Sequence, residues 1–562
     1  MGVGNVQLNT EISAQTADKH RPIGLISLAV FTVAFLLLFL GMDRSCNLYD
    51  EGLVLTGAMR VAAGNIPYRD FYANYGPAQF YIIAGLFKLT GPSVLIERLF
   101  DLSVQAGIVT ACFAWCGVYC RKVVAIGTSV ICGLWLFSFH LYGTPIMPAL
   151  LLSLAGSGLF LSAYSRKRSD WRFLAAGAVT GLVALFRGDV GFGLLIAHLC
   201  FIAITVINSG RARQALGYGL RSAGRYIAGI AVVCAPPALM YLAVAPIHDF
   251  VFDMITFPGK YYSRARNLPF PGLRPHPLDS LAVYLPVLVI GILLCLFLTN
   301  RYTRKSSSAP RFTSGQDVKE LLTLFGLLIL IFYGKGFVRV STFHMFLAIV
   351  PSLIVIAVLL EHAGKYSVTL RSVIVFTALF SVIMPGGAAL RSARNLSTVL
   401  AELISPPGPA SIRDLTSWCG VPNPLHRGLC FLVDSDHIKA IRFIDSHASP
   451  ADQLFVGLPH HDKILDNDVL TYFAAQRMPA TRWYHFDPDL QTRADIQREM
   501  ISEIKSKSVP YVLLDSQFDN HNEPNDSSKN SGVTLLDDFI RDNYRQVESF
   551  GELSVWAKTT SR

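Results

Sequence analysis

Charged residues are scarce in this sequence. Only 16% of its 562 residues are Asp, Glu, Lys or Arg, whereas 52% are hydrophobic and the mean hydropathy is +0.42. An average globular protein carries about 25% charged residues and is far less apolar. The composition therefore excludes an ordinary soluble protein and predicts a polytopic α-helical membrane protein.

Common catalytic and nucleotide-binding motifs are also missing. The sequence has no Walker loop, no GxGxxG after a predicted strand, no HExxH and no GxSxG. Each of these motifs holds a phosphate, a metal or a nucleophile through a fixed spacing of residues. We therefore do not expect soluble nucleotide chemistry.

Long apolar runs dominate the sequence instead. The run 23–42 has no charge and is long enough to cross a hydrocarbon core of about 30 Å as a helix. No small-residue cleavage site follows it, so we expect a retained span and not a signal peptide. With ten further runs, about eleven transmembrane helices are expected: 96–119, 123–142, 145–164, 173–186, 190–207, 226–246, 281–298, 321–333, 341–360 and 368–386. The shorter segment 78–90 contains Lys88 and is predicted to be an interfacial helix.

Basic residues indicate the orientation. If residues 1–22 are a cytoplasmic tail, the inner loops are short and basic, as the positive-inside rule requires. Their cations are Arg121, Lys122, Arg166, Lys167, Arg168, Arg172, Arg211, Arg213, Arg221, Arg225, Arg301, Arg304, Lys305, Arg311 and Lys319. The loops 43–95 and 247–280 and the tail 390–562 then lie outside. The tail has 18 Lys and Arg against 23 Asp and Glu, so its charge of −5 leaves +15 for residues 1–389. The basicity reflects membrane topology and not nucleic-acid binding.

The tail 390–562 differs in its pattern of apolar and polar residues from the transmembrane domain 23–389. After a Pro-rich hinge (ISPPGPAS), β-like runs such as QLFVG and YVLLD alternate with helical stretches. This alternation is typical of a soluble α/β domain. The last stretch, YRQVESFGELSVWAK, predicts a β-hairpin. Cys419 and Cys430 form a disulfide, which an oxidising compartment would allow, or remain two unpaired thiols.

Polar clusters elsewhere are expected to be structural. Glu97, Arg98 and Asp101 begin the second span together and are expected to form an ion-pair cluster. Two groups in the tail could imitate metal ligands, but we expect solvated turns at both: Asp434, Asp436 and His437, and His460, His461 and Asp462.

An acid pair, Asp50 and Glu51, follows the first apolar run by about eight residues. It lies in the loop 43–95, which is too polar to cross a bilayer and whose aromatic, glycine-rich text (NLYDEG, NIPYRDFYANYGP) suits a structured pocket. A carboxylate at a membrane surface can take a proton from an acceptor hydroxyl. The alternative is that Asp50 caps the helix starting near Glu51, and the two roles are compatible.

The order of these parts resembles the GT-C glycosyltransferases over nearly the whole chain. The stretch LYDEGLVLTGAMRVAAGNIPYRDFYANYGPAQFYIIAGLFKLTG is similar to the first extracytoplasmic loop of their polyprenyl-phosphate-sugar-dependent branch. That branch includes protein O-mannosyltransferases and aminoarabinose transferases of lipid A. The resemblance implies transfer of a sugar from a lipid-phosphate carrier to an acceptor on the outer face of the membrane. Asp50 matches the catalytic carboxylate, and the resemblance implies a catalytic role for Glu51 as well, its neighbour in the motif.

An inverting transfer needs a base near the acceptor oxygen and positive charge near the departing phosphate. Cations on outer loops run against the positive-inside trend, so they are candidates for binding the donor phosphate: Arg187, Lys260, Arg264, Arg266 and Arg339. Each could instead contact anionic lipid or an acidic partner, as Arg187 could with Asp189. Candidates for the sugar pocket, or else for loop packing, are Tyr68, Arg69, Asp70, Tyr72 and Tyr75.

One departure from the family concerns metal binding. Several relatives place a second acidic residue in the short outer loop after the third span, but here that loop reads HLYGTP and has no carboxylate. A divalent metal would have only Asp50, Glu51 and Asp70 as nearby ligands, and the sequence defines no metal site.

The sequence thus predicts an inverting membrane glycosyltransferase that uses a polyprenyl-phosphate sugar and a glycan, lipid or protein acceptor. The expected location is the bacterial inner membrane, with the active site and tail on the periplasmic side. Two alternatives remain: a lipid-linked saccharide transporter or flippase, and a non-catalytic membrane assembly protein. A transporter more often shows paired repeats and polar residues in mid-span, which are not found here.

Overall fold

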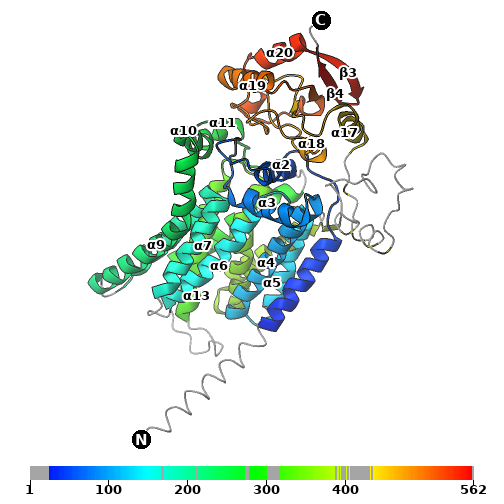
Figure 1. Ribbon diagram of the computed structural model, residues 1–562. Coiled ribbons are helices and arrows are strands. Elements are labelled where there is room, and N and C mark those ends of the chain that lie inside the picture. The colour runs from blue at the N-terminus through cyan, green and yellow to red at the C-terminus, as the bar shows by residue number, and fades with distance from the viewer. Residues whose placement is uncertain are drawn as a thin grey trace.

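The computed structural model describes residues 24–165, 170–209, 212–272, 278–299, 315–386 and 434–559, together with single positions between 389 and 431. Cys419 and Cys430 lie outside the described residues, so the choice between a disulfide and two thiols stays open. A bundle of helices forms most of the molecule, and a smaller unit that contains a β-sheet covers one end of it (Figure 1).

All eleven apolar runs predicted from the sequence contain a helix. These helices are Gly24–Leu40, α4 (Val94–Tyr119), α5 (Lys122–Phe139), α6 (Ile146–Ser165), α7 (Asp170–Phe186), α8 (Gly188–Ile207), α9 (Ala212–Val244), α12 (Tyr284–Leu298), α13 (Gly315–Gly336), α14 (Thr342–Glu361) and α15 (Val368–Ile383). Within the described ranges, seven helices are long and apolar enough to cross a membrane. The predicted polytopic helical architecture is confirmed.

Helix α14 occupies the centre of the bundle. Its apolar window is 83% buried, and it packs against α4, α5, α12, α13 and α15. Helix α9 is the opposite case, because only 11% of its window is buried. Apolar side chains on such an outer helix are stable only where lipid replaces water around them.

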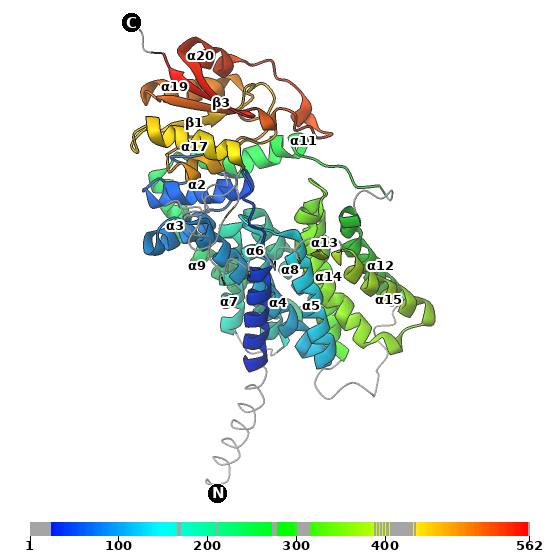
Figure 2. The ribbon, with the colours of Figure 1, turned by 90° about the vertical axis from the view of Figure 1, so that its right-hand side faces the viewer.

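The outer segments predicted from the topology gather at one end of the bundle, beneath the sheet-containing unit (Figures 1 and 2). Helices α2 (Asp50–Ala62) and α3 (Ala78–Thr90) lie across this end, and α3 confirms the helix predicted at 78–90. The later outer segment folds into α10 (Ile247–Val251), the π-helical turns η1 (Phe252–Thr256) and η2 (Pro258–Tyr262), and α11 (Ser263–Ala265). Both segments can therefore contribute to one site.

The carboxyl-terminal unit is built on a four-stranded sheet with the order β1-β2-β4-β3. Strand β1 (Leu454–Gly457) is parallel to β2 (Tyr511–Asp515), and β4 (Leu553–Lys558) is antiparallel to both β2 and β3 (Tyr544–Phe550). The β3–β4 pair is the predicted hairpin. The helices are α17 (Ser435–His447), α18 (Leu470–Ala474), α19 (Ala494–Ser506) and α20 (Leu535–Asn543). Short 3-10 turns of the chain are η3 (Leu278–Val283), η4 (Ala363–Lys365), η6 (Ser516–Phe518) and η7 (Asp526–Ser528).

Helix α2 joins the bundle to the carboxyl-terminal unit. A Cβ atom on Gly52 would lie 2.4 Å from the backbone nitrogen of Leu470, so only glycine allows α2 to approach α18 this closely. The N–H groups of Val469 and Leu470 donate to the Leu48 carbonyl at 3.0 and 2.9 Å, and the Thr56 hydroxyl donates to the Val469 carbonyl at 2.9 Å. The carboxyl-terminal unit thereby fixes the start of α2, where Asp50 lies.

We expected solvated turns at the two histidine-containing groups of the tail, but each group contains a buried histidine. His437 and His461 are buried, whereas His460 is exposed. The Nδ1 atom of His461 lies 2.6 Å from Asp537 Oδ1. The sequence did not reveal this burial because Asp468 and Asp515 beside His437, and Asp537 beside His461, lie far away along the chain.

Candidate active site

Asp50 is the first residue of α2 and not its N-cap, which is Tyr49, so the capping alternative for Asp50 is wrong; the side chain of Asn47 instead satisfies the first backbone N–H groups of the helix. The Asn47 side-chain oxygen accepts hydrogen bonds from the N–H groups of Tyr49 and Asp50 at 2.9 and 2.7 Å. Among the described residues, no hydrogen bond or ion pair engages the Asp50 carboxylate. The half-buried carboxylate is therefore free to meet a ligand.

Burial raises the pKa of the Asp50 carboxyl above its ordinary value. The guanidinium groups of Arg266 and Arg339 oppose this shift, whereas the carboxylates of Asp466 and Asp487 add to it. Asp50 is thus close enough to two cations and to two acids of the carboxyl-terminal unit to feel their charges. A carboxylate with a raised pKa is a better proton acceptor than an exposed one.

Glu51 has a different environment from its neighbour. It is fully buried, and its carboxylate oxygens lie 2.5 and 2.9 Å from the guanidinium of Arg98 on α4. The same guanidinium donates to the carbonyls of Asp43 and Ser45 and stacks on the Tyr142 ring, 3.8 Å from its centroid. Glu51 therefore anchors the start of the loop to α4 and is fully buried, whereas Asp50 is half-buried.

The expected cluster of Glu97, Arg98 and Asp101 is divided, because Arg98 pairs with Glu51. Glu97 and Asp101 instead both accept the N–H of Gly143 in the HLYGTP loop, at 3.1 and 2.7 Å. Gly143 has φ of +64°, and a Cβ there would lie 2.6 Å from Glu51 Cα. The loop that lacks a carboxylate of its own is thus held directly against the acid pair by two carboxylates of α4.

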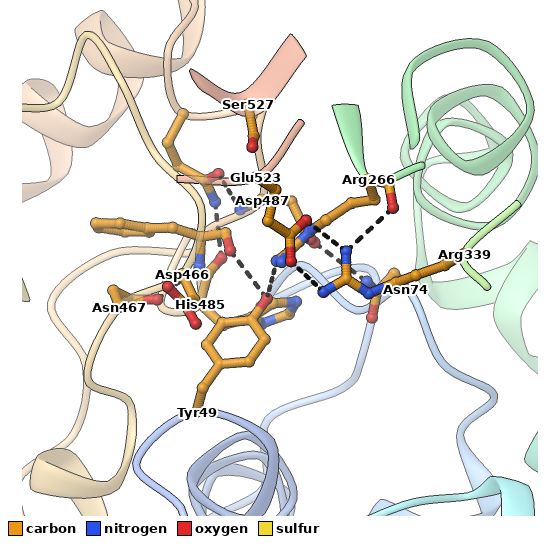
Figure 3. Close-up of polar contacts among 12 residues, drawn as sticks. Tyr49, Asn74, Arg266, Arg339, Asp466, Asn467, His485, Asp487, Glu523 and Ser527 are labelled. Carbon is orange, nitrogen blue, oxygen red and sulfur yellow. Dashed lines mark hydrogen bonds and ion pairs between the residues drawn. The ribbon is translucent and has the colours of Figure 1, made fainter. Parts of the chain in front are cut away.

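Arg266 and Arg339 lie side by side next to Tyr49 and two acidic side chains of the carboxyl-terminal unit, Asp487 and Glu523 (Figure 3). Arg266 is buried, and its Nη2 atom lies 3.2 Å from Asp487 Oδ1 and 3.4 Å from the Tyr49 hydroxyl. Its Nε atom is buried without an acceptor among the described residues. Arg339 pairs with Glu523 at 2.5 and 2.6 Å and donates to the Arg266 carbonyl at 3.0 Å. An anionic ligand would satisfy the orphan donor of Arg266.

The carboxyl-terminal unit supplies residues that the sequence did not predict for the site. Asp487 accepts hydrogen bonds from the Tyr72 hydroxyl and the Asn74 amide, both at 3.1 Å, besides its contact with Arg266. His485 stacks on Tyr72 with ring centroids 4.7 Å apart. Figure 3 shows these side chains converging with Asp466 and Glu523 of the same unit. No motif marks them, because they lie in irregular loops more than 400 residues from the acid pair.

The five predicted phosphate-binding cations fall into two groups. Arg266 is buried and Arg187 and Arg339 are half-buried, whereas Lys260 and Arg264 are exposed. Arg187 lies over the Tyr75 ring, 4.9 Å from its centroid, and pairs with Asp189 at 3.1 Å, as the sequence allowed. Lys335 pairs with the same carboxylate at 3.2 Å and adds a fourth cation.

The five predicted sugar-pocket residues are also divided. Tyr72 contacts Asp487 and Tyr75 lies under Arg187, and the buried Tyr68 donates its hydroxyl to the Tyr75 carbonyl at 2.7 Å. Arg69 and Asp70 pair with each other at 2.7 Å and line a different cavity, of about 420 Å³, between the first loop and the carboxyl-terminal unit.

The three carboxylates that could have held a metal in the first loop have separate surroundings. Glu51 is paired with Arg98 and Asp70 with Arg69, whereas the Asp50 carboxylate has no such pair among the described residues. The described residues therefore do not combine these three acids into one ligand set.

Comparison with known proteins identifies the fold. No protein-family model matches the chain, and no curated protein sequence matches it. The solved structure of ArnT from Cupriavidus metallidurans in the apo state matches with a TM-score of 0.51 and 12% identity, over 95% of this chain and 98% of that one. This likeness shows the GT-C fold that the sequence resemblance implied.

Two further structures are similar at lower scores. ArnT from Cupriavidus metallidurans bound to undecaprenyl phosphate has a TM-score of 0.48 and 13% identity, over 96% of this chain and 98% of that one. The oligosaccharyltransferase AglB from Archaeoglobus fulgidus, in complex with an inhibitory peptide and a dolichol-phosphate, has a TM-score of 0.49 and 12% identity, over 87% and 69% of the two chains.

Proposed function

We propose that this chain of GT-C fold is a membrane glycosyltransferase that moves a sugar from a polyprenyl-phosphate carrier to an acceptor hydroxyl, with Asp50 as general base. The observation that carries the proposal is the free, half-buried carboxylate of Asp50 close to Arg266 and Arg339. The donor class follows from the resemblance of the first loop and from these cations close to Asp50.

The proposed reaction is a single displacement at the anomeric carbon. Asp50 takes the hydroxyl proton of the acceptor while the acceptor oxygen bonds to that carbon and the bond to the phosphate oxygen breaks. The departing lipid phosphate keeps the electron pair, and its charge is stabilised by Arg266, Arg339 and Arg187. Attack opposite the leaving phosphate inverts the anomeric configuration. Glu51 takes no chemical part, and supports the loop through Arg98.

The proposed location is the bacterial inner membrane. The transmembrane domain comprises residues 23–389, and Asp50 and the domain 390–562 lie on the extracytoplasmic side. Support comes from the basic loops, which the topology places together on the other side of the membrane.

The test is donor consumption by the purified full-length protein. Polyprenyl-phosphate sugars are supplied in liposomes with hydroxyl acceptors, and release of the lipid phosphate is measured together with the anomeric configuration of the product. Release that requires both protein and acceptor, with inversion, supports the proposal. Movement of the intact donor across the bilayer without release would favour a transporter, and no donor use at all would favour an assembly role.

The donor-phosphate assignment predicts unequal effects of the outer cations. Arg266→Gln should raise the KM for the donor about tenfold or more, because a charge-assisted hydrogen bond contributes about 1.5–3 kcal/mol. The acceptor KM should change little. The matched control is the double variant Lys260→Gln and Arg264→Gln, which changes exposed cations of the same segment and should leave both constants nearly unaltered. Equal loss on donor and acceptor in Arg266→Gln would contradict a phosphate role.

The raised pKa of Asp50 predicts the acid limb of the pH profile. A general base must be ionised, so activity falls as pH drops through its pKa, and burial places that fall above the ordinary carboxyl value of about 3.9. Arg266→Gln removes a cation that lowers the pKa of Asp50, so the acid limb of the pH profile of this variant should move to higher pH. Asp466→Asn removes an acid that raises it, so its limb should move to lower pH. Initial rates between pH 3 and pH 8 test this, and limbs that stay fixed in both variants would assign the titration to another group.

A further inference from the structure

A second polar cluster lies inside the carboxyl-terminal unit and has no part in the proposed transfer. His437 comes from α17, Asp468 lies two residues before the start of α18, and Asp515 ends β2. The Nε2 atom of His437 lies 3.4 Å from Asp468 Oδ2 and 3.4 Å from Asp515 Oδ2. All three side chains are buried, and one ligand atom from each lies within 4.8 Å of the others.

The spacing of these atoms suits a shared cation. A separation of 3.4 Å is long for an N–H···O hydrogen bond, which prefers about 2.7–3.2 Å. Two ligands that each lie about 2.0–2.2 Å from a tetrahedral metal ion are about 3.4 Å apart. The separations of the histidine nitrogen from the two carboxylate oxygens therefore match two edges of such a site, and the two oxygens lie within 4.8 Å of each other.

An unpartnered buried oxygen points to the same conclusion. Asp468 Oδ1 accepts the N–H of Thr471 at 3.0 Å, but Oδ2, which faces His437, has no hydrogen-bond partner among the described residues. A buried carboxylate oxygen without a partner is costly, and a bound cation removes the cost. The other ring nitrogen of His437, Nδ1, lies 2.5 Å from Asp434 Oδ2. A carboxylate behind the imidazole is the usual means of orienting a metal-binding histidine.

We propose that His437, Asp468 and Asp515 bind one Zn²⁺ ion, with the side-chain amide of Gln517 as the fourth ligand. The Gln517 Nε2 atom lies 3.5 Å from His437 Nε2 and donates to Asp515. Because the two ends of an amide have the same shape, a half-turn presents its oxygen to the ion instead. Four ligands in a buried position make a closed structural site. An imidazole and a low ligand number favour Zn²⁺ over Ca²⁺ or Mg²⁺.

The place of the cluster gives the ion a function. Asp468 is followed directly by Val469 and Leu470, whose N–H groups hold the Leu48 carbonyl two residues before Asp50. An ion that fixes Asp468 to α17 and β2 therefore also fixes the contact that positions α2. The site is structural, and its existence does not depend on the proposed glycosyltransferase activity.

The experiment is zinc binding by the purified full-length protein in detergent. The protein is treated with a chelator, dialysed and titrated with Zn²⁺, with metal content measured by mass spectrometry and stability by thermal unfolding. We expect one Zn²⁺ per chain and a higher Tm on loading. Asp468→Asn should weaken zinc binding at least about tenfold. The matched control is His447→Gln, an exposed histidine on the same helix, which should bind zinc as the wild type does.

X-ray absorption at the zinc edge of the wild-type protein keeps the proposal testable if Asp468→Asn does not fold. We expect nitrogen and oxygen neighbours with scattering from a single imidazole. No stoichiometric zinc and no shift in Tm would overturn the site, and the cluster would then be a protonated histidine held by carboxylates. Sulfur neighbours would overturn it as well, because they would place the ion among the thiols of the bundle.

Discussion

Replacement of Asp50 by Asn should lower the rate of sugar transfer by about 100- to 10,000-fold, the range that a positioned general base contributes. Asn keeps the size and polarity of the side chain but cannot accept a proton from an alcohol. The protein should insert and fold normally, because the Asp50 carboxylate makes no hydrogen bond or ion pair among the described residues and the Asn47 side chain accepts the first N–H groups of the helix. Lipid-phosphate release at saturating donor and acceptor is the measurement.

The matched control for this prediction is Asp43→Asn, the same chemical change in the same loop. The Asp43 side chain accepts the N–H of Ser45 at 3.0 Å, a bond that Asn can also accept. Its activity should stay close to that of the wild type. Near-normal transfer by a well-folded Asp50→Asn variant would refute the base assignment, and a comparable loss in Asp43→Asn would show that the loop is sensitive to any change of charge.

Replacement of Arg98 by Met should destabilise the protein by about 3–5 kcal/mol, because it leaves the Glu51 carboxylate buried and unpaired. It also removes the donors that hold the carbonyls of Asp43 and Ser45. The double variant Glu51→Leu with Arg98→Met should recover part of the loss, since a buried pair is often replaced by apolar side chains at little cost. The fraction of protein that stays monodisperse in detergent after heating measures the effect.

Arg121→Met provides the comparison for Arg98. Arg121 pairs with Glu361 at 2.9 Å, but its side chain is 78% exposed, against 1% for Arg98. The Glu361 side chain is only 7% exposed, but its carboxylate keeps the backbone N–H of residue 121 as a donor at 3.2 Å. An ion pair with a solvent-exposed guanidinium is worth about 0–1 kcal/mol. Arg121→Met should therefore melt close to the wild type. Similar melting of the Arg98 and Arg121 variants would contradict the role of the Glu51–Arg98 pair as the anchor of the loop.

The helical part of the fold was predictable because apolarity is a local property. A run such as 341–360 needs no partner to be recognised, and it coincides with α14 almost residue for residue. The hairpin at the end of the chain was predictable for the same reason. Asp50 could be selected because it stands in a short motif with a recognisable neighbourhood.

The residues around Asp50 could not be predicted, because their positions depend on contacts between segments that are distant in the sequence. The sequence around Glu51 does not indicate that Arg98 will pair with it. The sequence around Tyr49 does not indicate that Asp487 will lie beside the same arginine, Arg266. Lys260, Arg264 and Arg266 are equivalent in the sequence, yet only Arg266 is buried, since the turn at α11 directs it inward and leaves the other two exposed. The sequence also did not indicate that the Asn47 side chain would accept the first N–H groups of α2.

The most direct test of the account separates donor binding from chemistry in one variant. Equilibrium binding of a polyprenyl-phosphate sugar and its single-turnover transfer are measured for the wild type and for Asp50→Asn under the same conditions. We expect the donor affinity of Asp50→Asn to lie within about twofold of the wild-type value, and its transfer rate to be at least about 100-fold lower than that of the wild type. Donor affinity that falls as far as the rate, or a single-turnover rate that does not fall, would contradict the claim that Asp50 removes the acceptor proton.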